Sequence, residues 1–255
     1  MNQFTYVVTG AASGIGRCTA KTLAKAQHHL ILIDIQKEAL QDTCQELQEL
    51  DPHKELTLTP LCCDLSNPEE LVQLQETLTK IDCLTGVIHS AGLLGEYARC
   101  HELPLAQFDL VMKHQFYSAY YTAHACLPKF CENKGGSMVF VGGVGGLVAL
   151  AHLPAYTAAL HAVSGLVKAL ALDYGKDNIR VNGVLPAATH TPMYKKAQGN
   201  HPQLSRSGSL TKTAVPLSKI ASAKEVSDVI VFLLSEQASH ISGALLPIDG
   251  GFTTY

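Results

Sequence analysis

A glycine-rich segment near the start of the chain constrains its fold more than any other feature. The segment Thr9-Gly10-Ala11-Ala12-Ser13-Gly14-Ile15-Gly16 joins a short β-branched run to a helical pattern. Glycine permits a tight turn and lets backbone N–H groups approach phosphate oxygens, and the N-terminus of the following helix adds a favourable dipole. A glycine turn can also be purely structural. At the first strand-to-helix crossover of a parallel sheet, however, the segment predicts a dinucleotide site. The residues expected to hold the diphosphate are Gly10, Ser13, Gly14, Ile15 and Gly16.

Short β-branched runs alternate with longer helical patterns along the whole chain. The strand-like runs are Phe4–Thr9, Leu30–Ile33, Leu56–Cys62, Leu84–His89, Ser137–Val141, Ile179–Leu185 and Ala244–Pro247. The helical patterns are Gly14–Gln27, Gln36–Leu50, a helix capped by Ser66 or Asn67 with Pro68 in its first turn, Leu105–Cys131, Ala155–Tyr174 and Glu225–Ser235. This alternation predicts a Rossmann-type, doubly wound α/β fold, a parallel sheet with helices on both faces. No linker or internal repeat interrupts the pattern, so we expect residues 1–255 to form a single domain.

Two stretches depart from the simple alternation. The stretch Thr191–Val215 is polar and rich in Ser, Thr, Gly and Pro, so we expect a mobile excursion that forms a substrate lid at about residues 191–215. The stretch Val139–Val167 carries no Asp, Glu, Lys or Arg and is long enough to suggest a membrane span. Its glycines, Pro154 and polar side chains favour a strand, a glycine loop and a buried helix instead.

Composition excludes several classes of function. Hydrophobic residues make up 47% of the chain and charged residues 16%, which suits a large buried core, and the net charge of -3 offers no footprint for nucleic acid or an anionic membrane. The eight cysteines form no C-x-x-C pair, which favours reduced thiols in a cytoplasmic protein. The twelve histidines lack H-x-x-x-H spacing, so no metal site is expected. Met1–Thr9 does not resemble a signal peptide.

Asp34 ends the second strand-like run, 24 residues after Gly10. A carboxylate at this position can accept hydrogen bonds from the ribose hydroxyls of the adenosine and would repel a 2′-phosphate. Arg17, one step into the first helix, weakens that argument, and capping of the next helix is an alternative role for Asp34. On balance the sequence favours NAD over NADP as cofactor.

These residues, from Thr9 to Gly16 with Asp34, resemble the glycine motif and acidic selector of the short-chain dehydrogenase/reductase family. Five further segments resemble motifs of the same family along the rest of the chain. They are Asp64-Leu65, His89-Ser90-Ala91-Gly92 where the family has Asn-Asn-Ala-Gly, Ile179-Arg180-Val181-Asn182, Pro186-Ala187-Ala188-Thr189-His190-Thr191 and Asp249-Gly250-Gly251. The resemblance implies about seven parallel strands and hydride transfer between a nicotinamide and a small alcohol or carbonyl substrate. It also implies cofactor contacts from Asp64, Leu65, Ala91, Gly92, Tyr156, Pro186, Thr189 and Thr191.

The departures from the family fall on its catalytic groups, which are an Asn, a Ser, a Tyr and a Lys. Tyr156 stands at the Tyr position, but Leu160 replaces the Lys four residues later, Gly143 replaces the Ser, and Gln115 replaces the Asn. An unperturbed phenol has a pKa of about 10, so without a neighbouring ammonium very little of Tyr156 ionises at neutral pH. We therefore expect Tyr156 to be the remaining catalytic residue of an atypical active site.

Two hypotheses follow from these departures. One is an NAD(H)-dependent oxidoreductase with altered acid–base groups, because the nicotinamide itself carries the hydride. The other is a catalytically impaired NAD-binding protein that acts as a sensor or scaffold. A third class, a purely structural oligomer subunit, would use the same fold without a cofactor. A histidine could replace a missing acid or base: His161 points away from Tyr156 on a helix, whereas His114, His152 and His190 stay open as candidates, with His152 the first to test.

The long helices also bear on assembly. Leu105–Cys131 and Ala155–Tyr174 are apolar on more than one face. A helix that is apolar all round must be covered on every side, and the sheet covers only one of them. The resemblance implies a homodimer or homotetramer formed through these helices.

Overall fold

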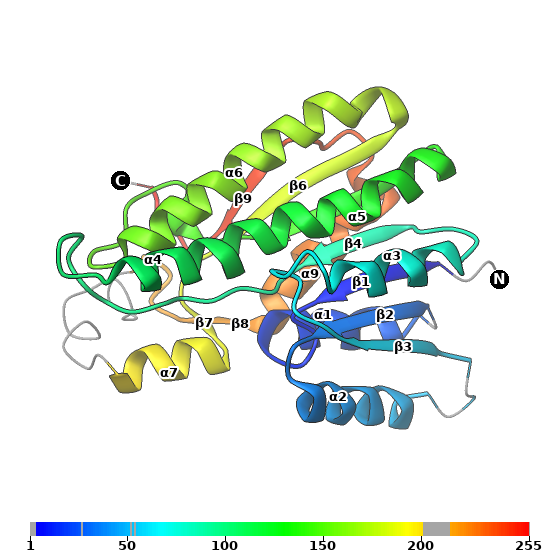
Figure 1. The fold of residues 1–255 in the computed structure, drawn as a ribbon, viewed down its shortest axis with the longest axis horizontal. Coiled ribbons are helices and arrows are strands. Elements are labelled where there is room, and N and C mark those ends of the chain that lie inside the picture. Colours follow the sequence, from blue (N-terminus) through cyan, green and yellow to red (C-terminus); the bar gives the residue numbers. More distant parts are fainter. Residues whose placement is uncertain (1–3, 27, 52, 54, 201–214, 255) are drawn as a thin grey trace.

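A seven-stranded sheet forms the centre of the molecule (Figure 1). The structure is a computed structural model that describes residues 4–26, 28–51, 53, 55–200 and 215–254. Its strands are β1 (Thr5–Thr9), β2 (His29–Asp34), β3 (Thr57–Cys62), β4 (Gly86–His89), β5 (Gly136–Val141), β6 (Ile179–Pro186) and β9 (Leu245–Ile248). They lie in the order β3-β2-β1-β4-β5-β6-β9, and each neighbouring pair is parallel. The predicted parallel sheet is confirmed.

Helices cover both faces of this sheet, as the alternation predicts. On one face pack α3 (Leu71–Thr79), α5 (Ser118–Asn133) and α6 (Pro154–Tyr174), and on the other pack α1 (Gly14–Ala24), α2 (Lys37–Glu49) and α9 (Ala223–Leu234). α4 (Leu105–Met112) lies against α6 and continues into α5 through a π-helical turn, η1 (Lys113–Tyr117). In Figure 1, α5 and α6 cross the front of the sheet, with α1 and α9 behind it.

The five inner strands are apolar because both faces of the sheet are covered, whereas the edge strands β3 and β9 are only partly buried. In β1 all five residues are buried, and successive side chains enter opposite cores: Val7 joins the core under α3, α5 and α6, whereas Val8 joins the core under α1 and α9. Ile31 and Leu32 of β2 divide in the same way. Each fully buried aliphatic side chain of this kind contributes roughly 1.5–3 kcal/mol to folding.

The uncharged stretch Val139–Val167 becomes the end of β5, a glycine turn and the first part of α6, as expected from the sequence. Pro154–Asp177 is long and apolar enough to cross a membrane, with a mean hydropathy of 1.3. In the fold this helix packs along β6, and it buries Val163, Val167 and Leu170 against the sheet. Pro154 at its first position suits a helix start, because proline lacks the N–H that would remain unpaired there.

The structure corrects two expectations about local structure. Residues 65–70 form turns rather than the first turn of a helix, and α3 begins only at Leu71. The reason is that the backbone N–H groups of Asn67, Glu70 and Gln73 bond the carbonyl three residues back, not four as in an α-helix. The stretch expected to be a mobile lid begins with a helix, α7 (Pro192–Asn200), which the sequence interpretation missed. The rest of that stretch, residues 201–214, lies outside the described residues. A short second sheet pairs β7 (Thr189–His190) with β8 (Ala221–Ser222).

The topology places a crevice at one edge of the central sheet. From β1 the chain proceeds outward to β2 and β3, then returns to β4 on the other side of β1 and continues to β5 and β6. The loops that follow β1 and β4 therefore leave the sheet in opposite directions, and ligands bind at such a switch point. α7 lies beyond the carboxyl ends of these strands, near β7 and β8 (Figure 1).

Candidate dinucleotide and substrate site

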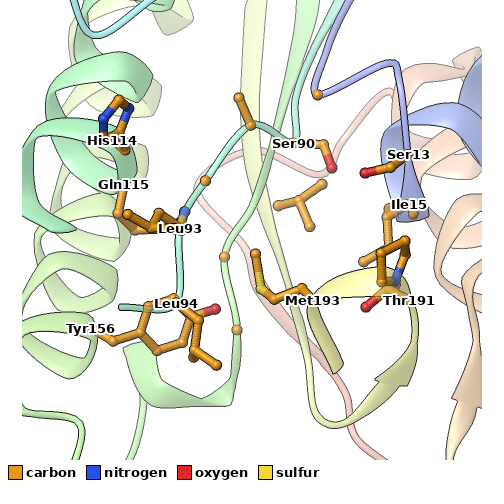
Figure 2. A pocket seen from close by; sticks show the side chains of 18 of the residues that line it. Ser13, Ile15, Ser90, Leu93, Leu94, His114, Gln115, Tyr156, Thr191 and Met193 are labelled. Carbon is orange, nitrogen blue, oxygen red and sulfur yellow. The ribbon is translucent and has the colours of Figure 1, made fainter. Parts of the chain in front are cut away.

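A cavity of about 430 Å³ opens at the carboxyl ends of the central strands. Figure 2 shows its two walls: η1 and α6 present His114, Gln115 and Tyr156 on one side, and Ser13 and Met193 lie on the other. Every residue predicted to contact the cofactor lines this cavity except Gly16. The lining residues from that set are Gly10, Ser13, Gly14, Ile15, Asp34, Asp64, Leu65, Ala91, Gly92, Tyr156, Pro186, Thr189 and Thr191.

The glycine loop has the geometry of an anion cradle. Gly10 and Gly14 adopt positive φ angles of 65° and 54°, which other residues rarely adopt. A Cβ on Gly10 would lie 2.9 Å from the backbone nitrogen of Ala91, so the loop can approach the β4 loop only as glycine. Within the described residues the Ser13 side chain does not cap α1, which leaves the first N–H groups of the helix facing the cavity. These groups can bind a diphosphate.

Gly16 serves the loop from outside the cavity. A Cβ at this position would lie 2.2 Å from the carbonyl oxygen of Gly10. The first turn of α1 therefore packs directly on the backbone of the glycine loop. Gly16 was expected to contact the diphosphate, but in the structure it packs against the loop and does not line the cavity.

Asp34 closes β2 with its carboxylate at the cavity. Its two oxygens accept the backbone N–H groups of Ala12 and Gln36, each at 3.0 Å. Arg17, the cation that weakened the argument for NAD, hydrogen-bonds Glu46 on α2 at 3.0 Å through Nε and at 2.5 Å through Nη2. Lys21 also pairs with Glu46. Both cations of α1 are thus directed towards Glu46.

Asp64 and Leu65 follow β3 and line the same end of the cavity. Burial alone would raise the pKa of Asp64, but two hydrogen bonds from Ser66 and the proximity of His114 lower it below its ordinary value. His114 Nδ1 lies 3.8 Å from Asp64 Oδ1. The two walls of the cavity therefore approach one another at this point.

The loop after β4 is anchored at both ends. Thr9 Oγ1 accepts the N–H groups of Ser90 and Ala91 at 3.0 and 3.1 Å. Gln115 Oε1 accepts the N–H of Leu93 at 3.0 Å. A Cβ on Gly92 would lie 2.3 Å from Gln115 Oε1, so only glycine fits between these anchors.

The loop after β6 contributes to the wall of the cavity that carries Met193. Thr189 Oγ1 donates to the carbonyl of Ala187, and Thr191 Oγ1 donates to the carbonyl of Thr189, at 3.0 and 3.2 Å. Thr191 Oγ1 also accepts the N–H of Tyr194 at 3.2 Å, so it caps the start of α7. Local hydroxyl bonds thus lead the chain from β6 into α7, and Met193 of α7 reaches the cavity.

Tyr156 lies in an apolar part of the cavity. Burial raises its pKa to about 12, and the neighbouring Tyr97 phenol adds to the shift. Leu160, one helical turn further along α6, is fully buried and brings no charge. A Cβ on Gly143 would lie 3.7 Å from the Tyr156 hydroxyl and 3.2 Å from Leu160 Cδ1. Tyr156 is therefore a neutral hydrogen-bond donor in an environment that opposes ionisation.

The histidines considered as replacements for the missing acid–base groups differ in whether they line the cavity. His152 and His190 are exposed and do not line the cavity, so neither is placed to assist Tyr156. His152 carries a positive φ of 61°, and its carbonyl accepts the N–H of Ala98 at 2.9 Å. His161 faces outward with Nδ1 2.9 Å from the carbonyl of Thr157. His114 alone of these lines the cavity, and it lies beside Asp64. The order of testing that put His152 first is wrong.

Several residues of the site were missed by sequence reasoning. Tyr97, Leu93, Leu94, Leu150 and Leu153 form much of the wall around Tyr156. They lie in irregular segments with no periodic pattern, so nothing in the sequence marked them as lining residues. Among the described residues no cluster of three His, Cys, Asp or Glu side chains could hold a metal ion. The eight cysteines are free thiols.

Comparisons with known proteins agree with this geometry. A family model described as enoyl-(acyl carrier protein) reductase matches residues 10–253. Cyclohexanol dehydrogenase of Acinetobacter sp. (strain SE19) is 29% identical over 254 residues, which are 99% of this chain and 96% of that protein. The crystal structure of levodione reductase is similar with a TM-score of 0.90 and 27% identity, covering 97% of this chain and 96% of that one. Carveol dehydrogenase from Mycobacterium avium, solved in complex with NAD, gives a TM-score of 0.90 at 25% identity and covers 99% and 98%.

Proposed function

Because the chain belongs to the short-chain dehydrogenase/reductase family, we propose that it is an NAD(H)-dependent oxidoreductase acting on uncharged alcohol or carbonyl compounds. One observation carries the proposal. A single cavity runs from the glycine loop and Asp34 to the Tyr156 hydroxyl. A dinucleotide held at the first end would present its nicotinamide at the second. When bound, the nicotinamide supplies or accepts the hydride.

The choice of NAD rests on the charges around Asp34. A 2′-phosphate beside its carboxylate would need a cation to offset the repulsion. Arg17 and Lys21 are engaged by Glu46, and among the described residues no Lys or Arg lines the cavity. The Asp34 carboxylate can accept ribose hydroxyls instead. These charges favour NAD(H).

The substrate class follows from the lining around Tyr156. Leu93, Leu94, Leu150 and Leu153 line the cavity, and Met193 reaches it from the wall opposite Tyr156 (Figure 2). The acidic lining residues are Asp34, which ends β2, and Asp64, which follows β3. Both strands lie at the opposite end of the strand order from β6. A site of this kind suits an apolar, uncharged carbonyl compound. Relatives named for cyclohexanol, levodione and carveol are consistent with a cyclic substrate.

The proton chemistry depends on Tyr156 without a lysine. In the direction of reduction the Tyr156 hydroxyl donates its proton to the substrate oxygen as that oxygen gains charge, and solvent restores the proton afterwards. A phenol with a raised pKa stays protonated at neutral pH and is competent for this step. In the direction of alcohol oxidation the Tyr156 phenolate must form first. The buried, uncharged Leu160 does not stabilise that phenolate. At neutral pH the resting site therefore holds the protonated Tyr156 that reduction consumes.

The test is oxidation of NADH by a panel of uncharged cyclic ketones, with Tyr156→Phe as the matched variant. The proposal predicts turnover that depends on the ketone and is lost in the variant, which keeps the shape of the side chain. Binding of NADH without turnover on any ketone would favour the non-catalytic NAD-binding alternative. Absence of NADH binding by folded protein would contradict both.

We also infer that the chain assembles into a homodimer or homotetramer through α5 and α6. A groove of about 300 Å³ between these helices is lined by Tyr120, Ala123, His124, Leu127 and Leu170, among others. Leu172 on α6 is exposed by 81%. Light scattering that reported a stable monomer would contradict this assembly. The free thiols support our further proposal that the protein works in the reducing cytoplasm.

A further inference from the structure

A buried histidine connects the two walls of the cavity from behind. His89, at the end of β4, is 2% exposed. Its Nδ1 lies 3.2 Å from Thr9 Oγ1 and 3.1 Å from Thr122 Oγ1, and its Nε2 lies 3.3 Å from Ser118 Oγ. Thr9 precedes the glycine loop, whereas Ser118 begins α5. The ring thus lies between the loop that would hold the diphosphate and the helix that follows η1.

The hydrogen bonds that Thr9 accepts determine which group its hydroxyl proton is donated to. Its oxygen accepts two backbone N–H groups, from Ser90 and Ala91, and these occupy both lone pairs. The hydroxyl proton is then the only means by which Thr9 can bond His89. Thr9 therefore donates, and His89 Nδ1 accepts.

The π-helical turn determines which group the Ser118 hydroxyl proton is donated to. In η1 the backbone N–H of Ser118 bonds the carbonyl of Lys113, five residues back. The carbonyl of His114, which would accept this N–H in an α-helix, instead accepts the Ser118 hydroxyl at 2.7 Å. Because the hydroxyl proton is committed to His114, Ser118 Oγ can only accept from His89. His89 Nε2 therefore carries the proton.

The Nε2–H tautomer is also the form that leaves fewest groups unpaired. Burial lowers the pKa of His89 to about 3, so the ring carries one proton at neutral pH. With that proton on Nδ1, the ring would bond Thr122 Oγ1, which already donates to the carbonyl of Ser118 at 2.7 Å. The Thr9 hydroxyl would then lose its acceptor, and Ser118 would have to turn away from His114. A buried polar group left unpaired costs about 1–3 kcal/mol.

From these contacts we propose that His89, as its Nε2–H tautomer, is a positioning residue of the cofactor and substrate site. Hydrogen bonds run in one direction from the Thr9 hydroxyl through the ring and the Ser118 hydroxyl to the His114 carbonyl, and bonds aligned in this way strengthen one another. At one end of this chain of hydrogen bonds, Thr9 holds the N–H groups of Ser90 and Ala91. At the other end, Ser118 stabilises η1, and Gln115 of η1 holds the N–H of Leu93. His89 thereby fixes both anchors of the loop that carries Gly92. This inference rests on the proposed oxidoreductase function.

Two serine variants test the proposal. Ser118→Ala removes the link between His89 and η1, and Ser137→Ala is its matched control. Both serines are 3% exposed and both donate to a backbone carbonyl, but Ser137 bonds Leu233 on the opposite side of the sheet from Ser118. With cyclohexanone as probe, we expect Ser118→Ala to lower kcat by about tenfold while the Kd for NADH changes by less than about threefold. Ser137→Ala should leave both within about twofold while losing similar thermal stability. Equal kinetics for the two variants would overturn the proposal.

A measurement that does not depend on turnover tests the role of His89 separately from the proposed oxidoreductase function. In protein labelled with ¹⁵N-histidine, the His89 signals, assigned by their loss in His89→Asn, should show a protonated Nε2 and an unprotonated Nδ1. The same signals should shift when NADH is added, and Ser118→Ala should remove the Nε2 hydrogen bond. A proton on Nδ1, or signals that ignore bound NADH, would overturn the role of His89. Failure of NADH to bind at all would instead contradict the proposed function.

Discussion

Leu160 Cδ1 lies 3.2 Å from the point at which a Cβ on Gly143 would sit, and that point is 3.7 Å from the Tyr156 hydroxyl. The Leu160 side chain therefore packs closely against Gly143 beside the phenol. In the family to which the chain belongs, a lysine and a serine are the usual residues at these positions. Here a methyl group and a missing side chain make the surroundings of the phenol apolar. The replacement of a charged and a polar residue by two apolar residues is the feature from which the chemical predictions follow.

The first prediction concerns restoration of the charge. Leu160→Lys combined with Gly143→Ser should lower the pKa of Tyr156, because a nearby ammonium favours the phenolate. The new serine Cβ meets only the flexible end of residue 160 at close range. Alcohol oxidation at neutral pH should rise by about 10²-fold, the lower end of the usual range for acid–base assistance. Leu160→Met is the uncharged control and should give no such gain, and a double variant no faster than this control would contradict the account.

The second prediction concerns pH dependence. Reduction needs protonated Tyr156, and its pKa of about 12 lies above the accessible range, so kcat/KM for the ketone should stay level between about pH 6 and 10. Oxidation needs the phenolate, so its kcat/KM should rise by about tenfold for each pH unit over the same range. Initial rates in both directions check this. A plateau of the oxidation rate below about pH 9 would show that another group lowers the pKa of the phenol.

The third prediction concerns the packing of the glycine loop. Gly16→Ala places a Cβ 2.2 Å from the backbone oxygen of Gly10, so the loop must move. We expect a loss of about 1–3 kcal/mol in the free energy of unfolding and at least a tenfold weaker affinity for NADH. Gly165→Ala on α6 is the control, since no atom lies within 4 Å of its Cβ. It should leave binding unchanged and stabilise the helix by up to about 1 kcal/mol.

The fourth prediction concerns cofactor choice. Asp34→Asn removes the charge and keeps an oxygen for the N–H of Ala12. The affinity for NADPH should improve by about tenfold, because one charge repulsion in a partly solvated site is worth on the order of 1 kcal/mol. Fluorescence titrations with NADH and NADPH measure both affinities. If the ratio of the two affinities does not change, Asp34 is not the selector.

The sequence was sufficient for the sheet, because its inner strands are buried on both faces and read as continuous apolar runs such as Tyr6–Val8 and Leu30–Ile33. It was also sufficient for the residues at the ends of those strands, since the carboxyl ends of parallel strands meet at one edge. Asp34, Asp64 and Ala91 come from three such ends and line one cavity. Chain order and periodicity contain this information.

The sequence did not reveal the parts of the site that depend on side-chain geometry. Tyr97 reaches the cavity from an irregular segment, and no pattern predicts its proximity to Tyr156. His152 was favoured because it precedes Tyr156 by four residues in a loop expected to border the substrate, but its side chain is exposed and does not line the cavity. The π-helical turn at Lys113–Tyr117 has no sequence signature either, although it decides the bonding of Ser118.

Calorimetric titration of NADH into folded protein tests the central claim most directly, because every chemical prediction requires the cofactor to lie in the cavity between the glycine loop and Tyr156. The account predicts heat of binding with one NADH for each chain in wild-type protein and in Tyr156→Phe, and its loss in Gly16→Ala. No heat with folded wild-type protein, or full binding by Gly16→Ala, would contradict the assignment of this cavity to the dinucleotide.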